Sequence, residues 1–139
     1  MKLVTKHSDY AVRAITYIAE NKRRFVSSLE IANKQKIPLL FLRRILQSLI
    51  KEKIIVSKEG VKGGVRLVGD PKRITVADVI KIFQGNIQLS DCMFRKEFCC
   101  NRKTCLLRKK IKNIEDIVGF EFKKITIQSL LIDAKRRKK

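Results

Sequence analysis

Two helical patterns separated by a very short turn constrain the fold of this chain more than any other feature. Ser27 and Glu30 have the spacing of a capping box, which predicts that a short helix begins there. After a turn at 36–37, Pro38 suits the first position of a second helix, whose apolar residues recur at helical spacing through Lys53. Such a pair is a helix-turn-helix, and its second helix is the candidate reader of DNA.

The sequence that follows this pair has the pattern of a β-hairpin. Residues 54–68, IIVSKEGVKGGVRLV, place β-branched side chains on both sides of a tip that contains Gly60, Gly63 and Gly64. A hairpin directly after a helix-turn-helix is a wing. The sequence therefore predicts a winged helix-turn-helix.

Further helices are predicted before and after this unit. Residues 8–21 repeat small and apolar side chains at helical spacing, and Ser8 is the candidate N-cap. Thr75 is expected to cap a helix over 76–84, and Thr126 to cap a short helix near the C-terminus.

A long amphipathic helix is predicted over 105–122, with Thr104 as its candidate cap. Its apolar stripe has no obvious partner inside so small a domain, and such a helix commonly buries this face against a copy of itself. We therefore expect a twofold homodimer. The stripe consists of Leu107, Ile111, Ile114, Ile117 and Val118.

The expected fold class is mainly α with a small β-hairpin wing, that is, a winged helix-turn-helix with a long C-terminal dimerisation helix. Residues 1–84 would form the DNA-binding region and residues 85–104 a cysteine-rich sensor loop. Residues 105–134 would form the dimerisation helix and a short C-terminal helix. The basic tail, 135–139, is expected to be disordered, because a run of like charges repels itself.

The charge of the chain indicates a polyanionic partner. The 33 Lys and Arg residues against 13 Asp and Glu give a net charge of +20, whereas a small domain needs a charge of only about 2–8 for solubility. Nucleic acid is the first candidate, either through sequence-specific contacts or through charge alone. No apolar run approaches the roughly 20 residues of a membrane span, so we expect a cytoplasmic protein without a membrane partner. The sequence has no C-x2-C pair, phosphate-binding glycine loop or acid–base constellation, which argues against an enzyme.

The candidate DNA-binding residues lie on the helix-turn-helix and the wing. Arginine can make bidentate contacts with guanine, and glutamine with adenine, in the major groove. Basic residues of the wing are placed to contact phosphates beside the groove. The candidates are Ser28, Pro38, Leu39, Leu40, Phe41, Arg43, Arg44, Gln47, Lys51, Lys58, Lys62, Gly63, Gly64 and Arg66.

All four cysteines lie in one basic segment, 92–105, which reads CMFRKEFCCNRKTC. Thiolates hold iron–sulfur clusters, and the surrounding lysine and arginine residues would offset the negative charge of a thiolate-bound cluster. Three alternatives stay open. Zinc would favour C-x2-C pairs, which are missing from the segment. A thiol switch could form without metal, or the cysteines could have no ligand at all.

Several motifs together resemble the Rrf-two family of bacterial winged-helix transcriptional regulators. They are DYAVRAITYIAE, then IANKQKIPLLFLRRILQSLIKEKIIVSKEGVKGGVRL, then ITVADVIKIFQG and the late ITIQSLL. The family includes an iron–sulfur biogenesis type and a nitric-oxide-responsive type. The resemblance implies a dimeric regulator, expected to be a repressor, that binds near-palindromic double-stranded DNA and forms its dimer through the helix after the cysteines.

The resemblance also implies a ligand set for a 2Fe-2S or 4Fe-4S cluster, which a purified sample need not retain. Family members that bind a cluster use three cysteines about five residues apart. Cys92, Cys99 and Cys105 leave gaps of six and five residues, and Cys100 in place of Cys99 leaves seven and four. Asp9 aligns with an aspartate that, in the nitric-oxide-responsive type, reaches the cluster from the other subunit. The signal would then be nitric oxide, redox or iron status.

Three positions depart from the family pattern. A tyrosine is usual where Val65 stands, and Arg43 replaces a glutamate of the iron–sulfur biogenesis type. Arg108 stands where that type has its cluster-ligating histidine. We therefore expect neither the DNA target nor the histidine ligation of that type.

Overall fold

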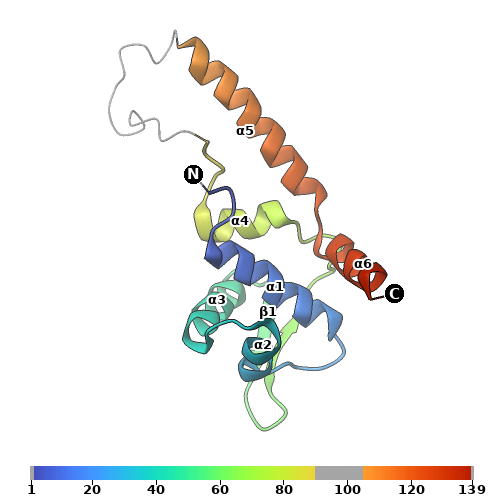
Figure 1. Cartoon of the computed structure of the whole chain (residues 1–139). Coiled ribbons are helices and arrows are strands. Elements are labelled where there is room, and N and C mark those ends of the chain that lie inside the picture. Colours follow the sequence, from blue (N-terminus) through green and yellow to red (C-terminus); the bar gives the residue numbers. More distant parts are fainter. Residues whose placement is uncertain (1, 90–104, 139) are drawn as a thin grey trace.

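Helices and one β-hairpin make up the part of the chain that the computed structural model describes, residues 2–89 and 105–138 (Figure 1). The mainly α composition and the hairpin are as predicted. The long helix α5 extends away from the other elements, and α6 returns to lie beside α1 (Figure 1). The elements are α1 (Lys6–Glu20), α2 (Ser28–Gln35), α3 (Leu39–Lys51), β1 (Ile55–Lys58), β2 (Gly64–Leu67), α4 (Val76–Gln84), α5 (Leu106–Lys124) and α6 (Ile127–Arg137).

A single apolar core joins α1, α2, α3, the hairpin, α4 and α6. Small residues on α1 let the neighbouring helices approach closely, and isoleucine and leucine side chains fill the remaining space. Truncating one fully buried leucine, such as Leu49, is expected to cost about 2–5 kcal/mol of stability. The fully buried side chains of this core include Ala11, Ala14, Ile15, Ile18, Val26, Ile31, Leu42, Leu49, Val79 and Ile127.

The N-termini of α4 and α6 lie side by side because the residues that cap them pair with each other. Thr75 and Thr126 form an isolated antiparallel bridge. Thr75 Oγ1 accepts from the Asp78 amide at 3.1 Å, while Asp78 Oδ2 accepts from the Thr75 amide at 3.0 Å. Thr126 and Ser129 repeat this reciprocal arrangement. Both predicted caps are confirmed.

The first helix begins earlier than predicted. Its N-cap is Thr5, whose hydroxyl accepts a hydrogen bond from the amide of Ser8 at 3.3 Å. The prediction that Ser8 caps this helix is wrong, because Ser8 lies inside the helix with its side chain fully buried. The Ser8 hydroxyl donates instead to Gln84, 76 residues away.

The predicted capping box of α2 forms only in part. Ser27 Oγ accepts from the Glu30 amide at 3.1 Å, as predicted. The Glu30 carboxylate does not return to the Ser27 amide, because it accepts hydrogen bonds from Arg24 and Tyr17.

The boundaries of α3 also differ from prediction. Pro38 is the N-cap residue and not the first helical residue, because its ψ of 130° is extended. The helix ends at Lys51, two residues before the predicted end, since Lys53 adopts a left-handed φ of 60° that a right-handed helix cannot continue.

The C-terminal helices are longer than predicted. Cys105 precedes the first turn of α5, and the predicted cap Thr104 lies outside the described residues. Helix α6 continues through Arg137, so the prediction of a disordered tail is wrong for 135–137. Basic side chains are favourable at a helix C-terminus, and Lys138 Nζ lies 3.3 Å from Glu20 Oε1. Among the described residues, no helix is long and apolar enough to cross a membrane.

Candidate nucleic-acid interface

The solvent-facing side of α3 carries the predicted base-reading residues. The helix buries one stripe of leucine and isoleucine against the core and leaves its polar stripe exposed. Leu40 in the first turn is 74% exposed, which is unusual for a leucine and leaves it free to contact a ligand surface. The exposed polar residues are Arg43, Arg44, Gln47 and Lys51.

The other predicted residues near this helix have different environments. Phe41 is half-buried, and its ring centroid lies 4.4 Å from that of His7 and 5.4 Å from that of Tyr10. Phe41 therefore fixes the start of α3 against α1. Ser28 and Leu39 are half-buried, and Pro38 is exposed.

The hairpin forms the predicted wing with a defined register. Ile55 pairs with Leu67, and Lys58 pairs with Gly64 at the end nearest the tip. Gly64 has a φ of +145°, and a Cβ there would collide with the backbone of Val26. A Cβ on Gly63 would collide with the Lys58 carbonyl oxygen. Both glycines are therefore needed for the shape of the wing.

A third short segment pairs with the wing, which the sequence patterns did not reveal. The Val26 amide donates to the Val65 carbonyl at 2.8 Å, and the Val65 amide donates to the Val26 carbonyl at 2.8 Å. Because Val26 directly precedes Ser27, the cap of α2, this bridge ties the wing to the helix-turn-helix.

Phe25 holds two of the predicted wing cations. The Arg66 guanidinium carbon lies 4.7 Å from the centroid of the Phe25 ring, and Lys58 Nζ lies 5.6 Å from it. Both distances are within the range of cation–π attraction. Phe25 was not among the predicted site residues. Its signal in the sequence is weak, because the two cations lie more than 30 residues further along the chain.

A network of hydrogen bonds among Tyr17, Arg24 and Glu30 holds the start of α2. Arg24 donates to both carboxylate oxygens of Glu30, at 2.7 and 3.1 Å, and the Tyr17 hydroxyl donates to Glu30 Oε2 at 2.7 Å. Hydrogen bonds from Arg24, and then from Tyr17, lower the pKa of Glu30 below its ordinary value. Burial, reinforced by the Glu30 carboxylate, raises the pKa of Tyr17.

The described residues hold only part of the predicted cluster-binding set. Cys92, Cys99 and Cys100 lie outside them. Cys105 is a free, half-buried thiol at the N-terminus of α5. Asp9 is exposed in the first turn of α1, with Oδ2 at 3.4 Å from Arg13 Nη1. Within 2–89 and 105–138, no three His, Cys, Asp or Glu residues come together as a metal site.

The thiolate chemistry of the cysteine segment fits an iron–sulfur cluster. Cys105 presents a free sulfur that is accessible in part, at the end of the segment that carries the other three cysteines. Sulfur ligands of this kind suit an iron–sulfur cluster, and a basic segment suits the negative charge of the assembled site.

The long helix α5 exposes a wide apolar face. None of its side chains is buried by the rest of the described chain. Leu106 is 75% exposed, Leu107 67%, and Ile117 and Phe120 are each 61% exposed. So many large apolar side chains on one helix form a surface that favours association with another protein surface.

The sequence matches known transcriptional regulators. The profile of the Rrf2 (Rrf-two) family, described as an iron-dependent transcriptional regulator, matches residues 4–133. A protein of Aquifex aeolicus, assigned as an HTH-type transcriptional regulator, is 31% identical over 124 residues, which cover 88% of this chain and 86% of that protein. The HTH-type transcriptional regulator NsrR of Shouchella clausii is 29% identical over 98 residues, which cover 70% of this chain and 66% of NsrR.

Solved structures share the fold. CymR of B. subtilis, the global cysteine regulator, has a TM-score of 0.78 at 21% identity, covering 94% of this chain and 97% of CymR. IscR of T. potens has a TM-score of 0.72 at 24% identity, and the match covers 100% of this chain and 92% of IscR. The oxidized form of Staphylococcus aureus CymR has a TM-score of 0.74 at 20% identity, and the match covers 94% of this chain and 96% of that CymR. The predicted winged helix-turn-helix fold is confirmed.

Proposed function

The chain belongs to the Rrf2 family of transcriptional regulators, and from that premise we propose that it is a homodimeric, sequence-specific repressor whose DNA binding is controlled by an iron–sulfur cluster. Like its relatives, which are transcriptional regulators, it is a DNA-binding regulator and not an enzyme. Three parts of the proposal need separate support: the DNA surface, the dimer and the sensor.

The DNA surface is supported by the exposed basic side of α3 beside the wing. This juxtaposition is the observation that carries the proposal, because the proposed base-reading and phosphate-binding side chains then lie on neighbouring elements that share one apolar core. In the proposed complex, Arg43, Arg44 and Gln47 contact base edges in the major groove. Lys58, Lys62 and Arg66 contact phosphates.

The experiment that tests this surface compares two single variants. Arg43→Ala should lower affinity for the selected operator by about 1–3 kcal/mol and relax the preference at one base pair. Lys62→Ala should weaken operator and random DNA equally and reduce the slope of log affinity against log salt by about 1. If Arg43→Ala, like Lys62→Ala, weakened binding to operator and to random DNA by the same factor, the assignment of α3 to base reading would be contradicted.

A competition experiment between operator and bulk DNA distinguishes sequence-specific binding from binding through charge alone. A specific regulator should prefer its operator over bulk DNA by about a thousandfold or more. The dimer should also show a salt slope that corresponds to roughly 6–10 phosphate contacts. A basic protein that binds without specificity would show the slope and not the preference.

The dimer is supported by the apolar face of α5. A twofold pairing of two such helices would bury Leu107, Ile114 and Ile117, which are 49–67% exposed in the single chain. It would also place two copies of α3 on one duplex, as a near-palindromic site requires.

The sensor is supported by the cysteine segment and by the family. The family profile is described as iron-dependent, and relatives include proteins named NsrR and IscR. We propose Cys92, Cys99 and Cys105 as ligands, with Cys100 as the alternative to Cys99 and Asp9 of the partner subunit as the fourth ligand. A bound cluster would supply a centre that reacts with nitric oxide or oxidants and is lost when iron is scarce.

Cys105 connects this sensor to the dimer. Because it directly precedes α5, a ligand bond at its sulfur would fix the start of the proposed dimerisation helix. Protein purified without oxygen should therefore be coloured and contain iron and sulfide, whereas a Cys92→Ala, Cys99→Ala, Cys105→Ala variant should contain neither.

A thiol switch without metal is the second candidate sensor. It is favoured by one finding, the likeness of the fold to a CymR structure in an oxidized form. In this case, iron-free protein would gain or lose operator affinity when treated with an oxidant and would recover with a reductant. If an iron–sulfur cluster is the sensor, oxidant and reductant should leave the operator affinity of iron-free protein unchanged.

A further inference from the structure

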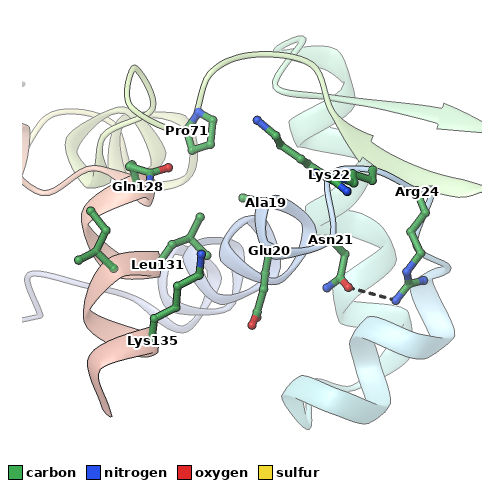
Figure 2. Close-up of a pocket in the computed structure, with 11 residues that line it drawn as sticks. Ala19, Glu20, Asn21, Lys22, Arg24, Pro71, Gln128, Leu131 and Lys135 are labelled. Atoms are coloured by element: carbon green, nitrogen blue, oxygen red, sulfur yellow. Dashed lines mark hydrogen bonds between the residues drawn. The ribbon is translucent and has the colours of Figure 1, made fainter. Parts of the chain in front are cut away.

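A pocket of about 480 Å³ lies between the C-terminal end of α1 with the loop that follows it, one side of α6 from Gln128 to Lys135, and Pro71 (Figure 2). This volume is within the range of about 300–1,000 Å³ that is usual for small-molecule sites. Ala19, Pro71 and Leu131 are buried side chains that give the pocket an apolar floor. The lining includes no residue of α3 or of the hairpin.

Three cations line the pocket beside this floor. Lys22, Arg23 and Lys135 line the pocket, and within residues 2–89 and 105–138 none of them lies within ion-pair distance of a carboxylate. Lys22 and Lys135 extend into the space from different sides of it (Figure 2). A fourth cation, Arg24, is already held by hydrogen bonds to Glu30 and Asn21.

Negative groups in the pocket do not neutralise these cations. Glu20 is the one carboxylate in the lining, and it already pairs with Lys138 at 3.3 Å. The C-terminal end of α1 adds a partial charge of only about half an elementary charge. Three cations that have no carboxylate partner among the described residues exceed that charge, and a concave site with an apolar floor concentrates their field.

We propose that this pocket binds a small organic anion with an apolar body, its carboxylate held by Lys22, Arg23 and Lys135 and its hydrocarbon part lying on Ala19, Pro71 and Leu131. The amide groups of Asn21 and Gln128 line the same pocket and provide hydrogen-bonding partners for the anionic group. The residues that line the pocket include none of those proposed to contact DNA.

Binding of such an anion would join α6 to the loop that leads into the helix-turn-helix. Lys22, Arg23 and Arg24 belong to this loop, which continues through Phe25 to Val26 and its bridge to the wing. Pro71 is fixed to α6 from the other side, since its carbonyl accepts from the Gln128 amide at 3.1 Å.

Hexanoate is a suitable probe because it carries one carboxylate and a short apolar chain. Titration of the full-length protein at constant ionic strength should give a dissociation constant on the order of 1 mM. Amide NMR signals of Gln128, Leu131 and residues 19–24 should shift. Each additional buried methylene should strengthen binding by at most about fourfold, so acetate should bind much more weakly than hexanoate.

Matched variants separate the pocket from the general positive charge of the chain. Lys22→Gln and Lys135→Gln should each weaken hexanoate binding about tenfold, whereas Lys81→Gln on the exposed side of α4 should not change it. Hexylamine, which has the opposite charge, should not bind.

Three results would overturn the proposal. Equal affinity for acetate and hexanoate, or equal losses in all three variants, would show that only general charge screening occurs. Loss of operator affinity in Lys22→Gln and Lys135→Gln, together with no hexanoate binding by the unmodified protein, would show that these cations contact DNA phosphates instead.

Discussion

Ser8 Oγ donates a hydrogen bond to Gln84 Oε1 at a distance of 2.5 Å, and this bond joins α1 to the last residue of α4. Gln84 also accepts from the Thr5 amide at 3.0 Å and donates to the Leu3 carbonyl at 3.3 Å. Ser8 is the fully buried polar side chain of the described part of the chain, so its hydroxyl depends on this partner. Gln84, which directly precedes the predicted sensor loop (85–104), is thereby anchored to the N-terminal segment.

Replacing Gln84 by leucine should destabilise the protein by about 1–3 kcal/mol, because the buried Ser8 hydroxyl and the Thr5 amide lose their acceptor. Chemical denaturation measures the difference. Gln88→Leu is the matched control, since Gln88 is exposed a few residues further along. If both variants unfold at the same denaturant concentration, the hydrogen bonds of Gln84 contribute nothing to stability.

Phe25 should position the wing for binding to DNA. Phe25→Leu keeps an apolar side chain but removes the ring face that attracts Lys58 and Arg66, so operator affinity should fall about two- to fivefold per subunit. Phe25→Tyr, which keeps the ring, should bind like the unmodified protein. Fluorescence anisotropy with labelled operator DNA measures these affinities, and thermal unfolding checks that Phe25→Leu is folded. An equal loss in the tyrosine variant would contradict a role for the ring.

The dimer interface should fail when a charge is placed on the apolar face of α5. Ile117→Asp would bury a carboxylate between the two helices and should raise the dissociation constant of the dimer by at least about tenfold. Lys123→Glu, on the opposite side of the helix, is the control and should stay dimeric. Sedimentation equilibrium measures both. A dimeric Ile117→Asp variant would exclude this face from the interface.

The Glu30 network predicts how stability depends on pH. Because Arg24, and then Tyr17, lower the pKa of Glu30, its stabilising effect is complete above the ordinary glutamate pKa of about 4.3. The effect is lost as the pH falls through the lower value of the folded state. Glu30→Gln should therefore be less stable than the unmodified protein at neutral pH, with a difference that shrinks in acid.

Urea denaturation at a series of pH values measures this difference. Glu59→Gln, at the exposed tip of the wing, is the control and should follow the unmodified protein at every pH. A difference for Glu30→Gln that stayed constant from neutral pH down to about pH 3 would show that the carboxylate charge does not stabilise the fold.

Local features of the fold were predictable from the sequence because their partners lie within a few residues. Thr75 and Thr126 were identified as caps since each bonds three residues ahead. The glycine-rich tip likewise marked the hairpin. For Ser8, the same local reasoning was wrong, because its partner lies 76 residues away and a hydroxyl satisfied in the core has no local signature.

The candidate interface was predictable where a helix or hairpin pattern in the sequence indicated which side chains are exposed. The spacing on α3 separated buried from exposed residues, and Arg43, Gln47 and Lys51 are exposed as expected. The bridge between Val26 and Val65 and the contact between Phe25 and Arg66 were missed, because each joins residues far apart in the sequence. The ligand set of the cluster stays a prediction, since Cys92, Cys99 and Cys100 lie outside the described residues.

The most direct test of the account measures operator affinity in three states of the same chain. Fluorescence anisotropy, without oxygen, would compare protein loaded with iron and sulfide, the same protein after chelation of its iron, and the variant in which alanine replaces Cys92, Cys99 and Cys105. We predict that the loaded and iron-free proteins differ at least tenfold in affinity for an operator selected from random duplexes, and that the variant matches the iron-free protein whether or not iron is supplied. Identical operator affinity in all three states would contradict control of DNA binding by a cysteine-held cluster.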